Sequence, residues 1–410
     1  MLTGKEIVLG VTGGIAAYKA VELLRLLTKG GATVHVIMTR SATEFVTPLT
    51  FQTLSMNPVH TELFNLISER EIGHISLADR ADLFIVAPAT ANLVGKLANG
   101  IADDLLTTTV MAAKAPVLIA PAMNVNMYQN PFYRENEAKL KGHGYRIVAP
   151  ATGLLACGWE GEGKFPEPPV IYEEAVALLS PRDLAGERLL VTAGPTREEI
   201  DPVRFLSNHS SGKMGYAIAR AAWRRGAEVV LVSGPTCLSP PHGVETLWVE
   251  SAEEMRSRVM ERFFDATVAI KAAAVADYRP LRRSGGKIKK SVKALTLDLT
   301  LNPDILGELG AIKGERILVG FAAETGDLVE NARKKLAEKN LDMVVANDID
   351  MEGAGFNSDT NIARLVFRDG RMEELPLMEK ADMADRILDR VVGLRRGNRD
   401  SGLGTRDLDV

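Results

Sequence analysis

Short apolar runs alternate with helical patterns along the whole chain. In the first half, apolar runs occupy residues 6–11, 33–38, 83–86 and 117–120, and residues 15–27 after the first run have helical spacing. Unbroken apolar runs are typical of strands that are buried on both faces of a parallel sheet. The pattern therefore predicts a doubly wound α/β domain, in which ligands bind at the carboxyl ends of the strands.

The second half of the chain repeats this pattern. Residues 189–215 begin as a short strand, continue as a polar loop and end in SSGKMG, before a helical pattern at 216–225. Further buried strands are expected at 229–232, 266–270, 317–320 and 341–345, with the last one closing the sheet. We therefore expect two Rossmann-like domains with mostly parallel sheets.

The boundary between the two domains is expected near a change in composition at residues 180–186. This gives a first domain at 1–186 and a second at 187–395. The last residues, 396–410, are rich in glycine and charge and are expected to be disordered.

Composition narrows the class of protein. The chain has 410 residues, of which 46% are hydrophobic and 25% charged, as in soluble globular proteins. A net charge of −4 gives no reason to expect a nucleic-acid or membrane partner. Cys157 and Cys237 lie far apart, which fits a reducing, cytoplasmic setting, and no apolar run is long enough for a signal peptide or a membrane span.

The loop after the first strand partly matches a dinucleotide fingerprint. Thr12-Gly13-Gly14 lacks the third glycine, and no acidic residue follows the second strand. That strand leads instead into Thr39 and Ser41, whose hydroxyls suit a terminal phosphate. We therefore favour FMN over NAD; the alternative is a tight turn that only packs a helix on a strand. Thr12, Thr39, Pro88 and Pro121 are all expected at one sheet edge.

Three residues of the first half are candidates for chemistry. His74 precedes a helix and could be a base or a helix-end hydrogen-bonding residue. Asn124 follows a strand, where its amide could hold a carboxylate or only stabilise a turn. Cys157 lies among glycines at 158, 161 and 163, so its thiol could close over a substrate on a mobile flap or could have no role.

Several motifs together resemble the flavin-containing cysteine decarboxylases, and in particular phosphopantothenoylcysteine decarboxylase. They cover residues 1–185 and are GVTGGIAAYK (10–19), GHISLA (73–78), APATAN (87–92), PAMNVNMY (121–128) and ACGWEGEGKFPEP (156–168). Two positions differ from the family pattern: Leu93, where many members have a hydroxyl, and Lys164, where arginine is common.

The resemblance implies that His74 is the catalytic base, that Asn124 holds the substrate carboxylate and that Cys157 is the proton donor. It implies FMN contacts at Gly14, Ile15, Thr39, Ser41, Ala89, Thr90, Asn92 and Thr107. Loss of CO₂ from a cysteine C-terminus would leave an unstabilised carbanion. Oxidation of the thiol to a thioaldehyde provides an electron sink, and a later reduction restores the thiol.

The second half carries a basic run at 282–293 and a lysine pair. The run is either a solvated surface or a flexible loop that folds over a polyphosphate, with Lys287 or Lys289 neutralising its charge. Lys335 and Lys339 are one helical turn apart, and by themselves they favour a solvated helix surface over a binding site. Gly212-Lys213 lacks the remainder of a Walker A motif, so a P-loop nucleotidase is disfavoured.

A second set of motifs resembles the phosphopantothenate–cysteine ligases. They cover about 187–395 and are TAGPTREEIDPVRFLSNHSSGKMG, AAAVADYRP, GGKIKK, LNPDIL, VGFAAET and KNLDMVVAND. The resemblance implies CTP as co-substrate, an acyl-cytidylate handled by Asn208, and Lys287 as the mobile lysine. It implies CTP contacts at Lys271, Ala272, Ala273, Asp277, Lys287, Pro303, Asp304, Ile305, Leu306, Phe321, Lys335 and Lys339. It also implies Mg²⁺, for which Asp277 is the candidate ligand.

Both resemblances on one chain imply a bifunctional enzyme of coenzyme A biosynthesis. It would have a flavoprotein decarboxylase domain and a ribokinase/Rossmann-like ligase domain, and would use 4'-phosphopantothenate, cysteine and CTP. They imply homo-oligomers, with trimeric decarboxylase units, dimeric ligase units and a dodecamer as the larger assembly. A nicotinamide dehydrogenase and a non-catalytic regulatory flavoprotein are the alternatives; a yellow protein argues against the first, and the joint presence of His74, Asn124 and Cys157 against the second.

Overall fold

The computed structural model describes residues 2–63, 73–156, 158–290, 295–324, 328–348 and 358–403. The chain forms two compact units, Met1–Ser180 and Pro181–Val410. The division lies a few residues before the boundary at 186 that the sequence predicted. Each unit has its own main sheet, so the prediction of two separate α/β domains is confirmed.

The first unit contains a six-stranded sheet in the order β3-β2-β1-β4-β5-β6, in which every pairing is parallel. The strands are β1 (Glu6–Val11), β2 (Thr33–Met38), β3 (Val59–His60), β4 (Leu83–Ala89), β5 (Val117–Pro121) and β6 (Arg146–Ile147). A separate hairpin pairs β7 (Ala151–Leu154) with β8 (Glu160–Lys164).

Helices cover both faces of this sheet. They are α1 (Ala17–Lys29), η1 (Arg40–Glu44), α2 (Pro48–Ser55), α3 (Gly73–Arg80), α4 (Ala91–Ala98), α5 (Leu105–Ala112), α6 (Val125–Gln129), α7 (Pro131–Gly142) and α8 (Pro168–Leu179). Because successive side chains of a strand point to opposite faces of the sheet, the core has two parts. Leu9 packs with α1 and α8 on one face, whereas Val8 packs with α3, α4 and α5 on the other. Burial on both faces explains why these strands are continuously apolar in the sequence.

The second unit is built on an eight-stranded sheet in the order β13-β12-β9-β14-β17-β18-β19-β20. Its strands are β9 (Arg188–Ala193), β12 (Glu228–Ser233), β13 (Glu245–Trp248), β14 (Val268–Lys271), β17 (Ile317–Glu324), β18 (Met343–Asp348), β19 (Thr360–Phe367) and β20 (Met372–Glu379). The strand β19 is antiparallel to both of its neighbours, β18 and β20, so that the sheet continues beyond β18. The expectation that the strand at 341–345 closes the sheet is therefore wrong.

Helices α9 (Lys213–Arg224) and α13 (Lys380–Leu403) cover one face of this sheet, and α10 (Ala252–Phe263), α11 (Ile305–Ala311) and α12 (Leu328–Glu338) cover the other. α13 continues to Leu403, into the segment 396–410 for which disorder was expected; residues 404–410 lie outside the described part. No helix of the described residues is both long and apolar enough to span a membrane.

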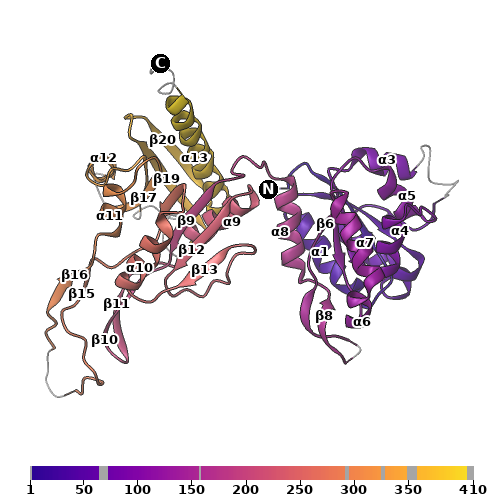
Figure 1. The fold of residues 1–410 in the computed structure, drawn as a ribbon, viewed down its shortest axis with the longest axis horizontal. Coiled ribbons are helices and arrows are strands. Elements are labelled where there is room, and N and C mark those ends of the chain that lie inside the picture. Colours follow the sequence, from indigo (N-terminus) through magenta and orange to yellow (C-terminus); the bar gives the residue numbers. More distant parts are fainter. Residues whose placement is uncertain are drawn as a thin grey trace. The chain divides into compact units, whose positions relative to one another are not determined.

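Two hairpins extend from the eight-stranded sheet (Figure 1). One pairs β10 (Arg197–Asp201) with β11 (Arg204–Ser207), and the other pairs β15 (Tyr278–Pro280) with β16 (Leu299–Leu301). The first hairpin occupies the segment that the sequence analysis predicted as a polar loop. Its strands are short and mostly polar, so they lack the apolar runs by which the other strands were identified.

Candidate functional site

The carboxyl ends of the parallel strands in the first unit meet at one edge, as predicted. Val11 pairs with Met38, and Ala89 with Pro121. The buried hydroxyl of Thr12 donates a hydrogen bond to the carbonyl of Pro88 at 2.7 Å and accepts one from the N–H of Thr90 at 3.0 Å. Thr12 therefore joins the loops that follow β1 and β4.

The loop after β1 lies directly against the start of η1. A Cβ at Gly13 would lie 2.3 Å from Cβ of Ser41, so only glycine fits there, whereas a Cβ at Gly14 would meet nothing within 4 Å. Beside them Oγ1 of Thr39 is buried and has no hydrogen-bond partner within the described chain. A tight glycine turn, an unsatisfied hydroxyl and open space above Gly14 fit a phosphate-bearing cofactor.

The other predicted flavin contacts lie around the same edge or in the helices behind it. Ile15 is exposed, Ala89 is buried at the end of β4, and Asn92 lies in the first turn of α4. Thr107 is fully buried, and its hydroxyl forms the capping box of α5 with Asp104. The side chain of Thr107 thus already has a structural role in this chain.

Asn124 is the N-cap of α6, and its Oδ1 accepts a hydrogen bond from the N–H of Asn126 at 2.8 Å. Next to it the N–H of Met123 donates to the carbonyl of Gly163 in β8 at 3.0 Å. A Cβ at Gly163 would lie 2.4 Å from the carbonyl oxygen of Met123. Gly163 therefore allows the hairpin to approach this loop closely. The mobility expected of the flap stays a prediction.

His74 and Cys157 are the remaining candidates of the first unit. His74 is half-buried in the first turn of α3, so it lies within the helix and not before it as predicted. Cys157 lies outside the described residues.

The second unit has a cavity of about 920 Å³ at the carboxyl ends of β14 and β17, next to the start of α9. Most of the residues that the ligase resemblance implied line it together. They are Asn208, Lys271, Ala272, Ala273, Asp277, Pro303, Asp304, Ile305, Leu306, Phe321, Lys335 and Lys339. These implied residues come from five segments of the sequence.

Hydroxyls at the end of β9 and in the segment after it hold the loop after β14 in place. The N–H of Ala273 donates to Oγ1 of Thr192 at 3.1 Å, and the N–H of Ala276 donates to Oγ1 of Thr196 at 3.0 Å. Nδ2 of Asn208 donates to the carbonyl of Ala274 at 3.1 Å. Asn208 is therefore held at the mouth of the cavity by the same loop.

Three lysines and one carboxylate gather on one side of the cavity. Nζ of Lys335 donates to the carbonyl of Phe321 at 2.8 Å, and Lys339 pairs with Asp304, which also caps α11. Lys271 is buried at the end of β14. Burial above all, and then repulsion from Lys335, lowers the pKa of Lys271 to about 8, while Asp304 opposes this shift.

A second pair of cations lines the same cavity and was missed by the sequence analysis. Lys213, in the first turn of α9, lies 2.7 Å from Asp359. Lys380 donates to the carbonyl of Ser358 at 2.5 Å, and burial followed by repulsion from Lys213 lowers its pKa. Lys213 belongs to the SSGKMG motif, whereas no motif marks Lys380, which reaches the cavity because β19 and β20 extend the sheet.

Lys287 does not line this cavity. It is exposed, and the neighbouring Ile288 is attached to the hairpin β10–β11: its N–H donates to Asp201 at 3.1 Å and its carbonyl accepts from Arg204 at 2.8 Å. The predicted covering of a polyphosphate by Lys287 therefore requires a movement of this loop.

Asp277 is exposed at the mouth of the cavity. Within the described ranges, no three His, Cys, Asp or Glu side chains are grouped to hold a metal ion.

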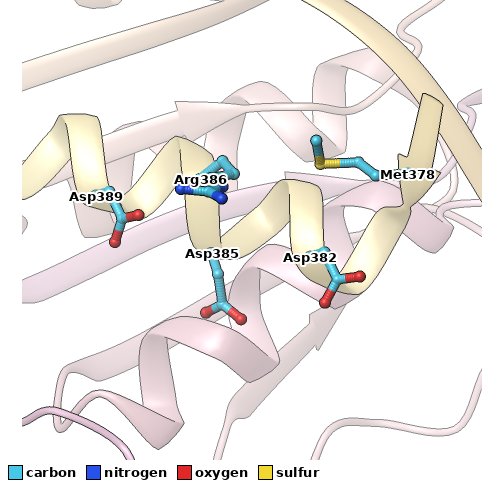
Figure 2. A pocket seen from close by; sticks show the side chains of 5 residues that line it. All are labelled: Met378, Asp382, Asp385, Arg386 and Asp389. Carbon is cyan, nitrogen blue, oxygen red and sulfur yellow. The ribbon is translucent and has the colours of Figure 1, made fainter. Parts of the chain in front are cut away.

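A smaller hollow of about 380 Å³ lies along α13, between Met378, Asp382, Asp385, Arg386 and Asp389 (Figure 2). None of these residues lines the large cavity. The nearby guanidinium of Arg225 is buried and donates to Asp183 at 2.6 Å and to Asp389 at 2.9 Å. We interpret this region as a structural ion-pair cluster.

Comparison with protein families matches both units. Residues 1–180 match the family "Flavoprotein", and residues 184–394 match "DNA/pantothenate metabolism flavoprotein C-terminal domain". The class of protein is thus a flavoprotein domain joined to a C-terminal domain of this second family.

Among characterised proteins, the chain is 51% identical to the Coenzyme A biosynthesis bifunctional protein CoaBC of Bacillus subtilis, over 97% of this chain and 98% of that protein. It is 46% identical to the protein of the same name from Escherichia coli, over 95% of this chain and 97% of that protein. The chain belongs to the CoaBC family.

Two solved structures match one unit each. The C-terminal domain of Coenzyme A biosynthesis bifunctional protein CoaBC is 46% identical, with a TM-score of 0.46, and covers 53% of this chain and 99% of its own. A mutant of PPC decarboxylase complexed with pantothenoylaminoethenethiol is 31% identical, with a TM-score of 0.38, and covers 42% of this chain and 96% of its own.

Proposed function

We propose that the second unit joins 4'-phosphopantothenate to cysteine with CTP, and that the first unit decarboxylates the product with FMN. The chain is a bifunctional enzyme of coenzyme A biosynthesis, with ligase and decarboxylase activities. The single observation that carries the proposal is family membership over 97% of the chain.

The charge of the large cavity supports the ligase part. The two substrates that react before cysteine enters are CTP, a triphosphate, and 4'-phosphopantothenate, a phosphorylated carboxylate, and both are anions. The cavity offers two groups of cations, Lys271 with Lys335 and Lys339, and Lys213 with Lys380. We assign the nucleotide to the first group and the phosphopantothenate phosphate to the second, where the N-terminus of α9 adds backbone N–H groups.

The ligase reaction then follows in two displacements. The carboxylate attacks the α-phosphorus of CTP and releases pyrophosphate, and the cysteine amine attacks the acyl carbon and releases CMP. We assign the positioning of the acyl-cytidylate to Asn208, whose amide is held at the cavity mouth. We assign the neutralisation of developing phosphate charge to Lys287, after its loop closes, and the Mg²⁺ to Asp277 with the phosphates.

For the decarboxylase, we propose that FMN contacts the loops around Gly14, Thr39, Ser41, Ala89 and Thr90. FMN would supply the reversible oxidation of the substrate thiol that makes CO₂ loss possible. Thr39 can satisfy its buried hydroxyl on the phosphate of the bound cofactor. Asn124 would orient the substrate carboxylate, His74 would act as the base, and Cys157 would return a proton to the product.

We also propose that the chain works as a homo-oligomer in the cytoplasm, with trimeric first units and dimeric second units, assembled as a dodecamer. In such an assembly, a site can be completed by a residue of a neighbouring copy.

The test is mass analysis after adding 4'-phosphopantothenate, cysteine, CTP and Mg²⁺ to the purified chain, with its absorption spectrum recorded first. We expect a flavin spectrum, CMP and pyrophosphate in equal amounts, and 4'-phosphopantetheine as the final product. Leaving out CTP should stop the first step alone, because added phosphopantothenoylcysteine would still be decarboxylated. No CTP-dependent conjugate would reject the ligase assignment, and a colourless protein would reject the flavin assignment.

A further inference from the structure

Asn347 brings an unsatisfied hydrogen-bond acceptor to the wall of the large cavity. It lies near the end of β18, paired with Ala323 on β17 and with Ala363 on β19. Its Oδ1 is buried, and no donor in the part of the chain that the structure describes reaches it. A buried oxygen without a donor is destabilising, and such groups in native proteins are normally hydrogen-bonded. Since Asn347 lines the cavity, a bound molecule can supply the missing donor.

Strand alternation places Asn347 on the face of the sheet that α9 and α13 cover. Val345 of β18 and Ala363, the partner of Asn347 on β19, both belong to the core of that face. By the same alternation, Lys271 of the group assigned to the nucleotide lies on the opposite face, which α10, α11 and α12 cover. Asn347 is therefore on the side of the cavity that is assigned to phosphopantothenate.

The other polar residues on this side of the cavity already have partners at the corresponding atoms. Lys213 and Lys380 begin the two covering helices, and their ammonium groups contact Asp359 and the carbonyl of Ser358. Asn361 of β19 is buried and lines the cavity too, but its Oδ1 accepts a hydrogen bond from the next N–H of the chain at 3.0 Å. Among these described residues, the open acceptor is Oδ1 of Asn347.

The ligand group that meets this oxygen must be a hydrogen-bond donor. Ionised phosphates and carboxylates only accept, so neither the triphosphate of CTP nor the two charged ends of 4'-phosphopantothenate satisfy Asn347. Between those ends, 4'-phosphopantothenate carries a secondary hydroxyl. A single quaternary carbon separates the carbon of this hydroxyl from the carbon that bears the phosphate. A phosphate held at Lys213 and Lys380 therefore keeps the hydroxyl on the same side of the cavity as Asn347.

We propose that Oδ1 of Asn347 accepts a hydrogen bond from the secondary hydroxyl of 4'-phosphopantothenate and thereby selects substrates that carry this hydroxyl. The inference rests on the proposed ligase function and adds to it the residue that recognises the middle of the substrate. An analogue without the hydroxyl leaves the buried oxygen unsatisfied, and a site built to bind a hydroxyl discriminates strongly against such an analogue. The contact is made away from the reacting carboxylate, so Asn347 determines specificity and does not take part in bond formation.

The experiment measures CTP-dependent pyrophosphate release by the full-length protein with 4'-phosphopantothenate and with the analogue in which hydrogen replaces the secondary hydroxyl. For wild type, we expect kcat/KM to be about 10- to 100-fold lower with the analogue. Asn347→Leu should use the two substrates about equally, because the acceptor is gone. Asn331→Leu, at an exposed position of α12 that does not line the cavity, is the matched control and should keep the wild-type ratio.

The ratio of the two kcat/KM values does not depend on the fraction of folded enzyme, so a variant that folds only in part still tests the inference. Asn347→Ala provides the same test with a smaller side chain. A wild-type ratio in both Asn347 variants would overturn the inference, as would equal use of both substrates by wild type. Lost discrimination between CTP and 2'-deoxy-CTP, with the first ratio kept, would overturn it in favour of a ribose contact. No pyrophosphate release by wild type would overturn the ligase function itself.

Discussion

The backbone N–H of Ile288 donates a hydrogen bond to Oδ2 of Asp201 at 3.1 Å, across 87 positions of sequence. Asp201 also binds the guanidinium of Arg204, which in turn donates to the carbonyl of Ile288. One buried carboxylate therefore attaches the basic loop that carries Lys287 to the hairpin β10–β11. The loop is therefore anchored at Ile288, directly beside Lys287, the residue that we assign to the phosphates.

We expect Asp201→Asn to release this loop, because the amide keeps the size of the side chain but loses its charge. Ligase turnover with CTP should fall, while decarboxylation of added phosphopantothenoylcysteine by the first unit stays at the wild-type rate. Both rates are measured on the same preparation. Equal loss of the two activities would indicate general misfolding and contradict the assignment.

The pH dependence of stability provides a second check on Asp201. Burial opposes its ionisation, but the bonds from Arg204 and from the N–H groups of Val203 and Ile288 hold its pKa below the usual 3.8. Its stabilising contribution is thus present above about pH 4 and is lost as the pH falls through the folded-state pKa. Between about pH 3 and 4 the difference in stability between wild type and Asp201→Asn should therefore shrink; a constant difference would contradict this.

Thr12 is predicted to determine how well the first unit holds its cofactor. Thr12→Val keeps the shape but leaves the carbonyl of Pro88 and the N–H of Thr90 without their buried partner. We expect a loss of about 1–3 kcal/mol in the stability of the first unit and a reduced flavin content after purification. Thr12→Ser is the matched control and should retain both, as measured by thermal unfolding and by the absorption spectrum.

Gly163→Ala should damage the decarboxylase selectively. The new Cβ would lie 2.4 Å from the carbonyl oxygen of Met123, at a backbone φ of +128° that L side chains rarely adopt. The hairpin β7–β8 must then move away from the loop of Asn124, at a cost of about 1–3 kcal/mol.

Gly142→Ala is the matched control, because a Cβ there meets nothing within 4 Å and the backbone φ is not positive. We expect a strong fall in kcat for CO₂ release with Gly163→Ala, wild-type activity with Gly142→Ala, and an unchanged ligase in both. Wild-type CO₂ release by Gly163→Ala would show that close contact of the hairpin is not required.

Neutralising either of two carboxylates in the ion-pair cluster of α13 should change the stability of the second unit, and the two changes should have opposite signs. Burial raises the pKa of Asp385, so its charged form costs stability, and this cost grows as the pH rises through the folded-state pKa. Asp389 instead accepts a hydrogen bond from the buried Arg225. Asp385→Asn is expected to raise the unfolding temperature of the second unit at pH 7, and Asp389→Asn to lower it.

The effect of Asp385→Asn should disappear at about pH 3, where the wild-type carboxyl is protonated as well. Calorimetric scans at pH 7 and at pH 3 measure this directly. A lower Tm for Asp385→Asn at pH 7 would refute the role assigned to burial.

Much of the fold was predictable because it depends on local patterns. Continuous apolar runs identify strands buried on both faces, and the turns and hydroxyls after them identify the edge where Thr12 and Thr39 lie. The hairpin β10–β11 was missed because its strands are short and mostly polar. β19 and β20 were missed although residues 360–367 alternate between half-buried and buried, because their place in the sheet depends on pairing with β18.

The sequence by itself determined that this chain carries two α/β domains, and its motifs pointed to a flavin and to a nucleoside triphosphate. These properties follow from residue types at short spacings. Only the tertiary structure decided which cations share the large cavity, that Lys271 is buried at the end of β14 and that Lys380 joins Lys213. Burial and charge balance arise from segments distant in sequence that pack against one another, and no local pattern of residues contains that information.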